Sequence, residues 1–364
     1  MNIESYVDKY NEISKKLFGD FLANGEGENI VISPLSIIAL LGVITESVSG
    51  KTRDEVVNFL SDSDDINIVQ VIRNIEETVQ NSGELTSANA VIINETLKGK
   101  IKEAYIPKVK DLFDAEVFLS KDIVKDVNEW VCEKTNGMIK EIADESMKGM
   151  LLAIINAISF MADWEDMYED DDIGPDEFNN LDGSVSEVEM MSSTESSYIE
   201  NEFYTGFVKE YKGGEYSYMA LLPKKKRSKT FIKRALTSTN LTDLFRSAQD
   251  MTVYATIPEY KVEFSENLNA LLEQNGINQI FADSADYSPV TDKVPLKTDG
   301  IIHKAYIEVD RRGTKAAAVT FDYVVAGCAL DFEYRNVTLD RPFIYAIMHN
   351  DTGLPVFIGN VNKL

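Results

Sequence analysis

The stretch that decides the fold lies near the C-terminus and reads, from residue 311 to residue 330, RRGTKAAAVTFDYVVAGCAL. It follows an apolar, strand-like run at residues 301–310, and its central alanines would suit a helix, because alanine has the highest helix propensity. Gly313 opens the alanine run, however, and the β-branched residues within the stretch are typical of a strand: Thr314, Val319, Thr320, Val324 and Val325. The segment is therefore suited to more than one conformation.

One face of this segment carries only small side chains. With the two-residue period of a strand, Thr314, Ala316, Ala318 and Thr320 point the same way. Small side chains enter the space between existing strands without a clash, so this face can be buried if the segment joins a sheet. Asp322 continues the same face, so insertion of the segment would either desolvate its carboxylate or leave it in a part of the sheet that water still reaches.

The composition is that of a large, acidic, folded protein. Of the 364 residues, 44% are hydrophobic, which is enough apolar material for a sizeable core. The formal net charge is −25, so the chain repels phosphate backbones and anionic lipid. Nucleic acid, membrane and heparin-like partners are therefore not expected. The one basic run, residues 224–229, is expected to be a solvated loop.

Strands and helices are predicted to mix along the whole chain. Residues 29–34 form a short buried strand that ends at Pro34, with Ser33 as the N-cap of the next helix. Helical periodicity predicts further helices at residues 56–78, 123–142 and 268–276. Strand-like runs occur at residues 90–93, 151–160, 216–222, 251–258, 301–310 and 342–361. No Pro-, Gly- or Ser-rich linker divides this mixture. The prediction is one α+β domain over residues 1–364.

Few residues are available for catalysis or metal binding. His303 lies in an apolar strand, where a lone histidine is more often a satisfied core residue than a base, and His349 is predicted to lie in a turn. No nucleophile elbow, phosphate loop, dinucleotide fingerprint or metal-ligand spacing is found. The remaining enzyme hypothesis is a hydrolase that uses Cys132 or Cys328 with His303; otherwise both cysteines are expected to be free thiols. No cofactor and no metal are expected.

The acidic stretch of residues 163–182 lacks the spacing of a calcium loop and is expected to be a solvated loop. An amphipathic helix and no secretory leader are expected at the start of the sequence, and its most apolar stretch, residues 30–44, is too short to span a bilayer. We expect a soluble protein, either cytosolic or the mature form of an exported one.

Several motifs, in order along the chain, resemble the serpin family. The pattern Gly313-Thr314-x-Ala316-Ala317-Ala318-x-Thr320 is similar to the hinge of inhibitory serpins, and the C-terminal strands at residues 340–343 and 352–361 match as well. Residues 130–142 resemble the helix that lies across the central sheet of the family. The positions that match the shutter and breach of the family are Ser33, Ser36, Asn89, Asn156, Trp164 and His303.

The resemblance implies a serpin fold of three β-sheets with about nine helices and an exposed reactive loop at about residues 311–335. It further implies a metastable, monomeric inhibitor. A target serine protease cuts the loop and forms an acyl-enzyme, and the cut loop then inserts into the central sheet and traps the protease covalently. The hinge residues that allow this movement would be Gly313, Thr314, Ala316, Ala317, Ala318 and Thr320.

The family's spacing puts the scissile bond in the range Ala326, Gly327, Cys328 and Ala329. All four are small, so shallow pockets of the elastase type fit best, with Cys328 or Gly327 as the residue on the amino side of the bond. Subtilisin-like proteases are an alternative, and Asp331 leaves a caspase-type target open. A non-inhibitory serpin with a carrier, chaperone or storage role is the alternative from another class.

One pair departs from the pattern of the family. Many inhibitory serpins have Glu at the position of Arg311 and Lys at the position of Glu259, so the charges here are exchanged. The resemblance predicts that Arg311 and Glu259, which we call the gate pair, form an ion pair of reversed polarity where the loop leaves the sheet.

Overall fold

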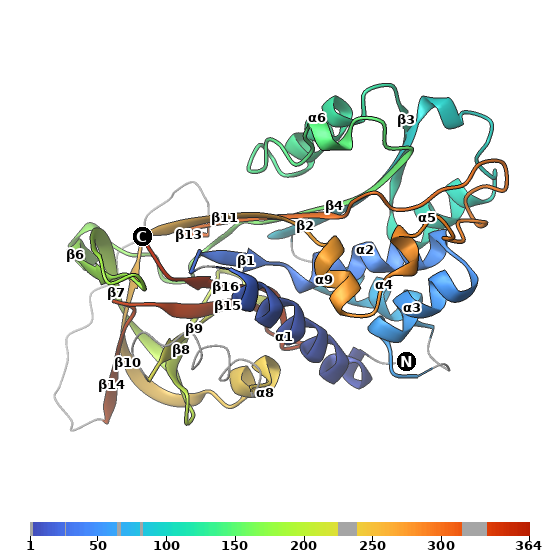
Figure 1. The fold of residues 1–364 in the computed structure, drawn as a ribbon. Helices are drawn as coiled ribbons and strands as arrows, with labels where there is room; N and C mark the ends of the chain where they lie inside the picture. The colour runs from blue at the N-terminus through green and yellow to red at the C-terminus, as the bar shows by residue number, and fades with distance from the viewer. Residues whose placement is uncertain (1–2, 26, 64–66, 81–82, 225–238, 315–332) are drawn as a thin grey trace. The chain divides into compact units, whose positions relative to one another are not determined.

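The computed structural model describes residues 3–25, 27–63, 67–80, 83–224, 239–314 and 333–364 (Figure 1). The chain folds into two compact units. Unit 1 comprises Met1–Ile13, Ile32–Ser159 and Phe264–Tyr306, and unit 2 comprises Ser14–Val31, Phe160–Glu263 and Ile307–Leu364. Helix α1 (Val7–Asn24) and the strands β11 (Tyr260–Asn267) and β12 (Ile302–Val309) each include the boundary between the units. Within the described residues, eight α-helices and three sheets give a mixed α+β fold, as predicted.

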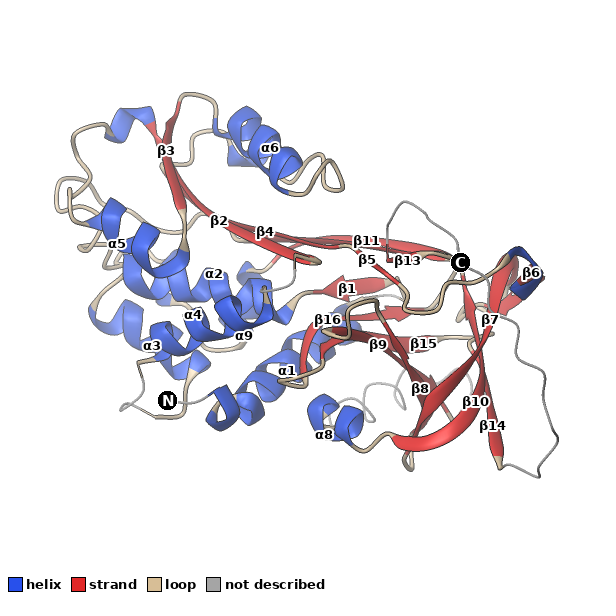
Figure 2. Cartoon of the chain, turned by 180° about the vertical axis from the view of Figure 1, so that it is seen from behind, coloured by secondary structure: helices blue, strands red, loops and turns tan. Residues whose placement is uncertain are grey.

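Unit 1 is built around an apolar central helix. Helix α2 (Pro34–Ser47) begins at the N-cap Ser33, whose hydroxyl accepts the N–H of Ser36, and nearly all of its residues are buried. It packs against the other helices of the cluster: α3 (Gly50–Leu60), α4 (Ile68–Val79) and α5 (Tyr105–Phe113). The short helix α9 (Asn269–Gln274) completes the helices on this side of the unit (Figure 2).

The sheet of unit 1 has three strands in the order β3-β2-β4. These are β3 (Glu116–Ser120), β2 (Leu85–Asn94) and β4 (Leu152–Phe160). Helix α6 (Ile123–Lys134) packs on β2. Its residues Val127, Trp130 and Val131 join apolar residues of β2 and β4 in one buried cluster. Burial of these side chains is the main stabilising term for this layer.

The large sheet of unit 2 has nine strands, in the order β1-β16-β15-β9-β8-β7-β10-β14, with β6 paired to β7. Figure 2 shows β7, β8, β10 and β14 as neighbouring strands. Helix α8 (Leu241–Arg246) packs on β16. The strands are β1 (Ile30–Ile32), β6 (Ile173–Asn179), β7 (Val185–Glu200), β8 (Tyr204–Glu210), β9 (Tyr216–Pro223), β10 (Gln249–Pro258), β14 (Tyr334–Thr338), β15 (Phe343–His349) and β16 (Leu354–Val361).

A third sheet has four strands in the order β11-β12-β13-β5. Its two short members, β5 (Ala162–Asp163) and β13 (Gly313–Thr314), lie in unit 2. Strand β13 comes directly after β12 in the chain, so the first two residues of the predicted hinge are part of this sheet.

Most predicted elements are confirmed, but four predictions need correction. The helical region 56–78 is two helices, because α3 ends at Leu60 and α4 begins only at Ile68. Helix α6 ends at Lys134, short of residue 142, and Asn136 beyond it takes a positive φ of 50°. The acidic stretch 163–182 is not a loop throughout, since β6 pairs with β7 there. His349 is the buried last residue of β15 and does not lie in a turn.

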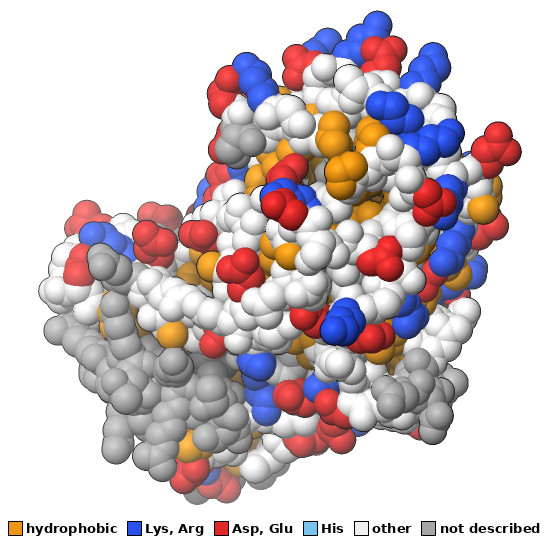
Figure 3. Space-filling model, turned by 45° about the vertical axis from the view of Figure 1, so that its right-hand side comes forward, with side chains coloured by type: hydrophobic (Ala, Val, Ile, Leu, Met, Phe, Trp, Pro, Cys, Tyr) orange, Lys and Arg blue, Asp and Glu red, His pale blue; other side chains and the backbone are white. Residues whose placement is uncertain are grey.

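The surface agrees with a charged, folded protein. On the face displayed in Figure 3, acidic and basic side chains are interspersed and do not form one patch of a single sign. None of the helices in the described part of the chain combines the length and the apolar character that a membrane-spanning helix requires.

Candidate functional site

The chain reverses direction directly after β12, at the start of the predicted reactive loop. The backbone N–H of Asp310 donates to the carbonyl oxygen of Gly313 at 3.0 Å. The carboxylate of Asp310 accepts the backbone N–H groups of Arg312 at 2.8 Å and of Gly313 at 3.2 Å. This tight turn returns the chain alongside β12, with Thr314 opposite Val309 in antiparallel register.

Gly313 and Thr314 occupy a space between two other strands. On the far side from β12, Gly313 pairs with Asp163 and Thr314 pairs with Ala162 of β5, again in antiparallel register. A Cβ atom at position 313 would lie 2.1 Å from the carbonyl oxygen of Ala162, which is far inside van der Waals contact. Glycine is therefore the residue that lets β13 approach β5 this closely.

The side chain of Thr314 is fixed in a buried position. It is 1% exposed, and its Oγ1 lies 2.7 Å from the hydroxyl oxygen of Tyr211. Burial raises the pKa of Tyr211 far above its ordinary value, so its phenol stays neutral and keeps this hydrogen bond. A larger or charged side chain at position 314 has no room here.

An aromatic residue holds the turn on its other side. The indole N–H of Trp164 donates to the carbonyl oxygen of Asp310 at 3.0 Å. The backbone N–H of Trp164 donates to the carbonyl oxygen of Arg312 at 2.8 Å. The ring of Trp164 stacks on that of Tyr211, with centroids 4.5 Å apart. The backbone N–H of Tyr168 donates to the carbonyl oxygen of Arg311 at 3.1 Å. The carbonyl oxygens of the three turn residues before Gly313 therefore each accept a hydrogen bond.

Beneath these aromatic rings lies a buried ion pair that the sequence did not reveal. Lys209 Nζ is 2.9 Å from Glu195 Oε1, and the two side chains are 2% and 12% exposed. The ammonium group also lies 5.5 Å from the ring centre of Trp164 and 4.7 Å from that of Tyr168, within the range of cation–π attraction. Ser193 Oγ donates to Glu195 at 2.6 Å. The pair thus supports the two residues that hold the turn.

The gate pair is in contact, and it has a third member. Arg311 Nε lies 3.4 Å from Glu259 Oε1, and Arg311 Nη1 lies 2.9 Å from Asp170 Oδ1. The side chain of Arg311 is 41% exposed, so these pairs are partly screened by water. The gate pair borders a cavity of about 740 Å³ whose walls also include Tyr260 and Val309. A role of the pair in the loop's exit from the sheet remains a prediction.

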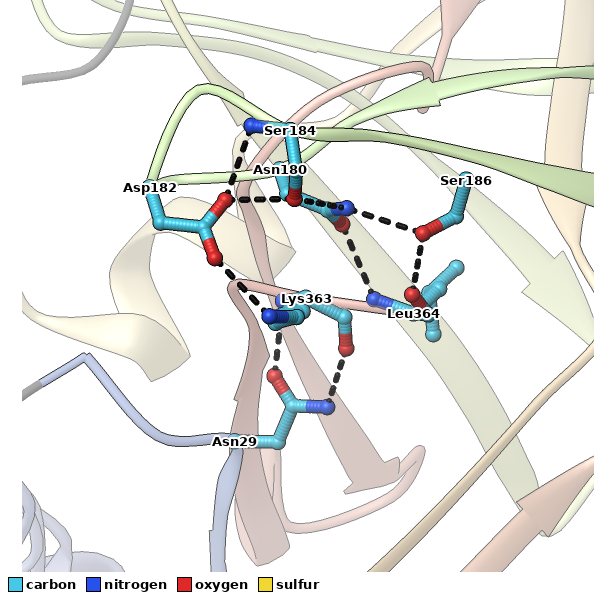
Figure 4. Close-up of polar contacts among 7 residues, drawn as sticks. All are labelled: Asn29, Asn180, Asp182, Ser184, Ser186, Lys363 and Leu364. Atoms are coloured by element: carbon cyan, nitrogen blue, oxygen red, sulfur yellow. Dashed lines mark hydrogen bonds and ion pairs between the residues drawn. The ribbon is translucent and has the colours of Figure 1, made fainter.

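The end of the chain forms another wall of this cavity and is fixed by polar contacts (Figure 4). The side-chain oxygen of Asn29 accepts the backbone N–H of Lys363 at 3.0 Å, while its Nδ2 donates to the carbonyl oxygen of Lys363 at 2.6 Å. Lys363 Nζ lies 2.8 Å from Asp182 Oδ2, and this hydrogen bond lowers the pKa of that carboxyl group. The backbone N–H of Leu364 donates to Asn180 Oδ1 at 3.0 Å.

The predicted shutter residues of unit 1 form a continuous chain of hydrogen bonds. His303 Nε2 accepts the backbone N–H of Ser33 at 3.2 Å. Ser36 Oγ donates to Asn156 Oδ1 at 2.6 Å, and Asn156 Nδ2 donates to Asn89 Oδ1 at 2.9 Å. Burial lowers the pKa of His303 from 6.5 to about 4, so the ring is neutral near pH 7 and can act as this acceptor.

The hydrogen-bond chain ends on a carboxyl group that sequence reasoning missed. Asn89 Nδ2 donates to Glu76 Oε1 at 3.3 Å and to the carbonyl oxygen of Phe113 at 3.0 Å. Burial raises the pKa of Glu76 to about 7. Glu76 lies in the amphipathic helix α4, where the sequence pattern predicts that a glutamate faces solvent. Its burial becomes evident only from the contact with Asn89 of β2.

The remaining predicted site residues lie outside the described residues. These are the hinge positions Ala316, Ala317, Ala318 and Thr320, the scissile-bond candidates Ala326, Gly327, Cys328 and Ala329, and Asp322. Cys132 is a free thiol. Among the described residues, no group of three or more His, Cys, Asp or Glu is arranged to hold a metal ion.

Comparison with known proteins identifies the class to which this fold belongs. The family model described as "Serpin (serine protease inhibitor)" matches residues 8–364, and the chain belongs to the serpin family. It is 25% identical to neuroserpin of Mus musculus over 377 residues, covering 96% of this chain and 90% of the relative.

Solved structures agree in fold. The native state of the thermophilic serpin tengpin matches with a TM-score of 0.89 and 32% identity, over 100% of this chain and 95% of that chain. The latent state of tengpin gives a lower TM-score of 0.83. Human thyroxine-binding globulin matches with a TM-score of 0.88 at 23% identity, over 100% of this chain and 99% of that chain, which shows likeness of fold alone.

Proposed function

We propose that this chain inhibits serine proteases as a suicide substrate, with the loop at about residues 311–335 as bait. The observation that carries the proposal is the position of Gly313 and Thr314, which are already paired with β12 on one side and β5 on the other. A loop that is to become a strand must enter at such a position. The small residues that follow in the sequence, Ala316, Ala317 and Ala318, fit the same space.

The chemistry of trapping follows from ordinary serine-protease acylation. The serine hydroxyl of the protease attacks the carbonyl carbon of the bait residue, the peptide bond to the next residue breaks, and the new amine leaves with a proton. An ester then joins the two proteins. Insertion of the freed loop moves the protease before water cleaves the ester, and each inserted residue gains backbone hydrogen bonds from two neighbouring strands.

The target is an elastase-like protease. The residues around the proposed bond, Ala326, Gly327, Cys328 and Ala329, are all small, and none is Arg or Lys. A shallow, apolar specificity pocket accepts such residues, whereas the pocket of a trypsin-like enzyme would be left with an unpaired carboxylate. Cys328 fills a small pocket better than Gly327 does. We further propose that the protein acts as a monomer in a one-to-one covalent complex, without cofactor, nucleic acid or heparin.

A denaturing gel with pancreatic elastase tests the proposal. The expected result is an SDS-resistant band at the summed mass of the two proteins, together with some loop-cleaved chain. Complete cleavage without that band would instead favour a non-inhibitory member of the family. Subtilisin and a caspase, run in parallel, test the two other target classes.

A pair of variants at Thr314 tests the hinge within this function. Thr314→Arg is expected to abolish the adduct and leave efficient cleavage, because a guanidinium does not fit the buried position beside Tyr211 and would displace residue 314 from between β12 and β5, where insertion starts. Thr314→Ser, which keeps the hydroxyl and reduces the volume, is the control and should form the adduct normally. An adduct from the arginine variant in wild-type yield would contradict the hinge assignment.

A further inference from the structure

One face of the large sheet of unit 2 is rich in hydroxyl side chains along three neighbouring strands. The register places Ser192 of β7, Thr256 of β10 and Thr338 of β14 in one row across the strands. The next row is Thr194, Tyr254 and Asn336. Residues that are paired in register point to the same face of a sheet, so these side chains form one surface.

The third row of this surface pairs Thr252 with Tyr334. Residues on the opposite face of the same strands, such as Val253, Ala255 and Val337, are buried in the core. We call the surface formed by the three rows the hydroxyl face, because seven of its eight named residues carry a hydroxyl group.

Two tyrosines stand out from the hydroxyl face. Tyr254 is 51% exposed and Tyr334 is 54% exposed, and their rings meet edge to face with centroids 5.3 Å apart. Exposed tyrosine rings in an edge-to-face pair are already held in place, so they lose little side-chain freedom when a partner binds. Tyrosine surrounded by Ser, Thr and Asn is the composition of many protein-binding surfaces.

The lack of charge is notable in this chain. Charged residues make up 27% of the sequence, and the net charge is −25, yet the eight residues of the hydroxyl face include no charged one. Acidic residues lie beside it, at Glu333 before β14 and at Asp250 in β10, and both are exposed. An uncharged centre with tyrosines and a charged rim is the arrangement found in protein–protein interfaces.

The length of the chain decides which partner reaches this face. Strand β14 begins at Tyr334, which follows the proposed scissile bond by five to eight residues. A span of that length reaches at most roughly 17 to 28 Å. A protease of elastase size, roughly 240 residues, is on the order of 45 Å across. A protease engaged on the loop therefore has part of its body over or beside the first residues of β14.

We propose that the hydroxyl face, centred on Tyr254 and Tyr334, is a second contact surface for the target protease, outside the bait loop. It rests on the proposed function. The two tyrosines contribute to the encounter between the intact proteins and thus to the rate at which the complex forms. They take no part in the later insertion of the loop, since they lie on an exposed face of a different sheet from β13.

The test measures the association rate with pancreatic elastase for Tyr254→Ser, Tyr334→Ser and the double variant. Each single variant is expected to slow association about tenfold, with the number of inhibitor molecules consumed per protease unchanged. Because the rings touch, the double variant should lose less than the product of the two effects. Val185→Ser is the matched control, because Val185 is 52% exposed on β7 but lies outside the three rows, and its rate should be that of the wild type.

A second measurement separates this proposal from the proposed function. Elastase whose catalytic serine is replaced by alanine cannot acylate, so its binding to the immobilised inhibitor reports only the initial complex. Weaker binding by the tyrosine variants supports the second contact surface, even if active elastase forms no covalent adduct. Binding and association rates equal to those of the wild type for all three tyrosine variants would overturn it. Changes in self-association alone, seen by sedimentation, would assign the face to a second copy of the chain and overturn it as well.

Discussion

The ammonium group of Lys209 and the carboxylate of Glu195 form a buried ion pair 2.9 Å across, directly beneath the two aromatic residues that hold the turn before Gly313. Replacing Lys209 by Met leaves the carboxylate buried without its partner. We therefore expect Lys209→Met to lower the free energy of unfolding by about 3 kcal/mol. Denaturant titration followed by tryptophan fluorescence measures the loss, since Trp164 is next to the lost charge.

The double variant Lys209→Met with Glu195→Gln provides the control. Both charges are then absent, and no carboxylate is left uncompensated in the interior, so most of the stability should return. A double variant as unstable as Lys209→Met would show that the methionine does not fit the space, and would remove the electrostatic explanation.

Gly313→Ala should displace β13 from the space between β12 and β5. The added methyl group would lie 2.1 Å from the carbonyl oxygen of Ala162, so the backbone must move and the pairing with β5 must weaken. We expect a lower melting temperature and a change in the fluorescence of Trp164, which bonds to the turn. Gly174→Ala is the control, because a methyl group at that position meets no atom within 4 Å. Equal effects of the two substitutions would contradict the role of close approach at Gly313.

The gate pair should make a small but measurable contribution to the free energy of unfolding. Arg311 is 41% exposed, so its contact with Glu259 is expected to be worth about 0.5 kcal/mol at low salt and less at high salt. A double-mutant cycle of Arg311→Gln and Glu259→Gln, read by denaturant titration and by the rate of heat-induced polymerisation, measures the coupling. A parallel cycle with Asp170→Asn shows whether the second acidic partner of Arg311 compensates. Zero coupling in both cycles would remove the gate pair as an interaction.

The sequence predicted those elements whose limits depend on neighbouring residues, such as helix caps, prolines and apolar runs. Helix α2 could be placed because Ser33, Pro34 and a continuous apolar run specify its start and its burial. Strand β6 could not, because its Gly174 and Pro175 and its acidic residues are typical of a loop, and only the pairing with β7 makes it a strand. Lys209 was missed for a related reason. A lysine in a strand is usually exposed, and its partner Glu195 is distant in sequence.

Stability should fall in acid through His303. Its pKa is about 4 in the folded protein and 6.5 in the unfolded chain, so the unfolded chain binds more protons between these values. The contribution of the neutral ring is present above pH 6.5 and is lost as the pH falls through 4, by up to about 3 kcal/mol. His303→Gln, which retains an acceptor for the backbone N–H of Ser33, should flatten this part of the curve. An unchanged slope between pH 6.5 and 4 in that variant would assign the acid sensitivity to other groups.

Glu76 should have the opposite pH dependence. Its pKa is about 7 in the folded protein against 4.5 in the unfolded chain, so its neutral form is favoured by folding. The stabilising effect is complete below pH 4.5 and is lost as the pH rises through 7. Glu76→Gln keeps an oxygen to accept the N–H of Asn89, so it should be more stable than the wild type at pH 8 and nearly equal at pH 4. A constant difference across that range would show that the carboxyl group does not titrate in the folded protein.

The pairing of Gly313 and Thr314 with both neighbouring strands also bears on how fast a loop can enter a sheet. Ordered growth of secondary structure has a costly nucleus, because the first residues are immobilised for few hydrogen bonds, and each later residue is added more cheaply. If the loop inserts as the proposed function requires, the paired Gly313 and Thr314 supply such a nucleus. Further growth then begins at the propagation step, and by the two-residue period the next side chain on the face of Thr314 is that of Ala316, one of the smallest there is.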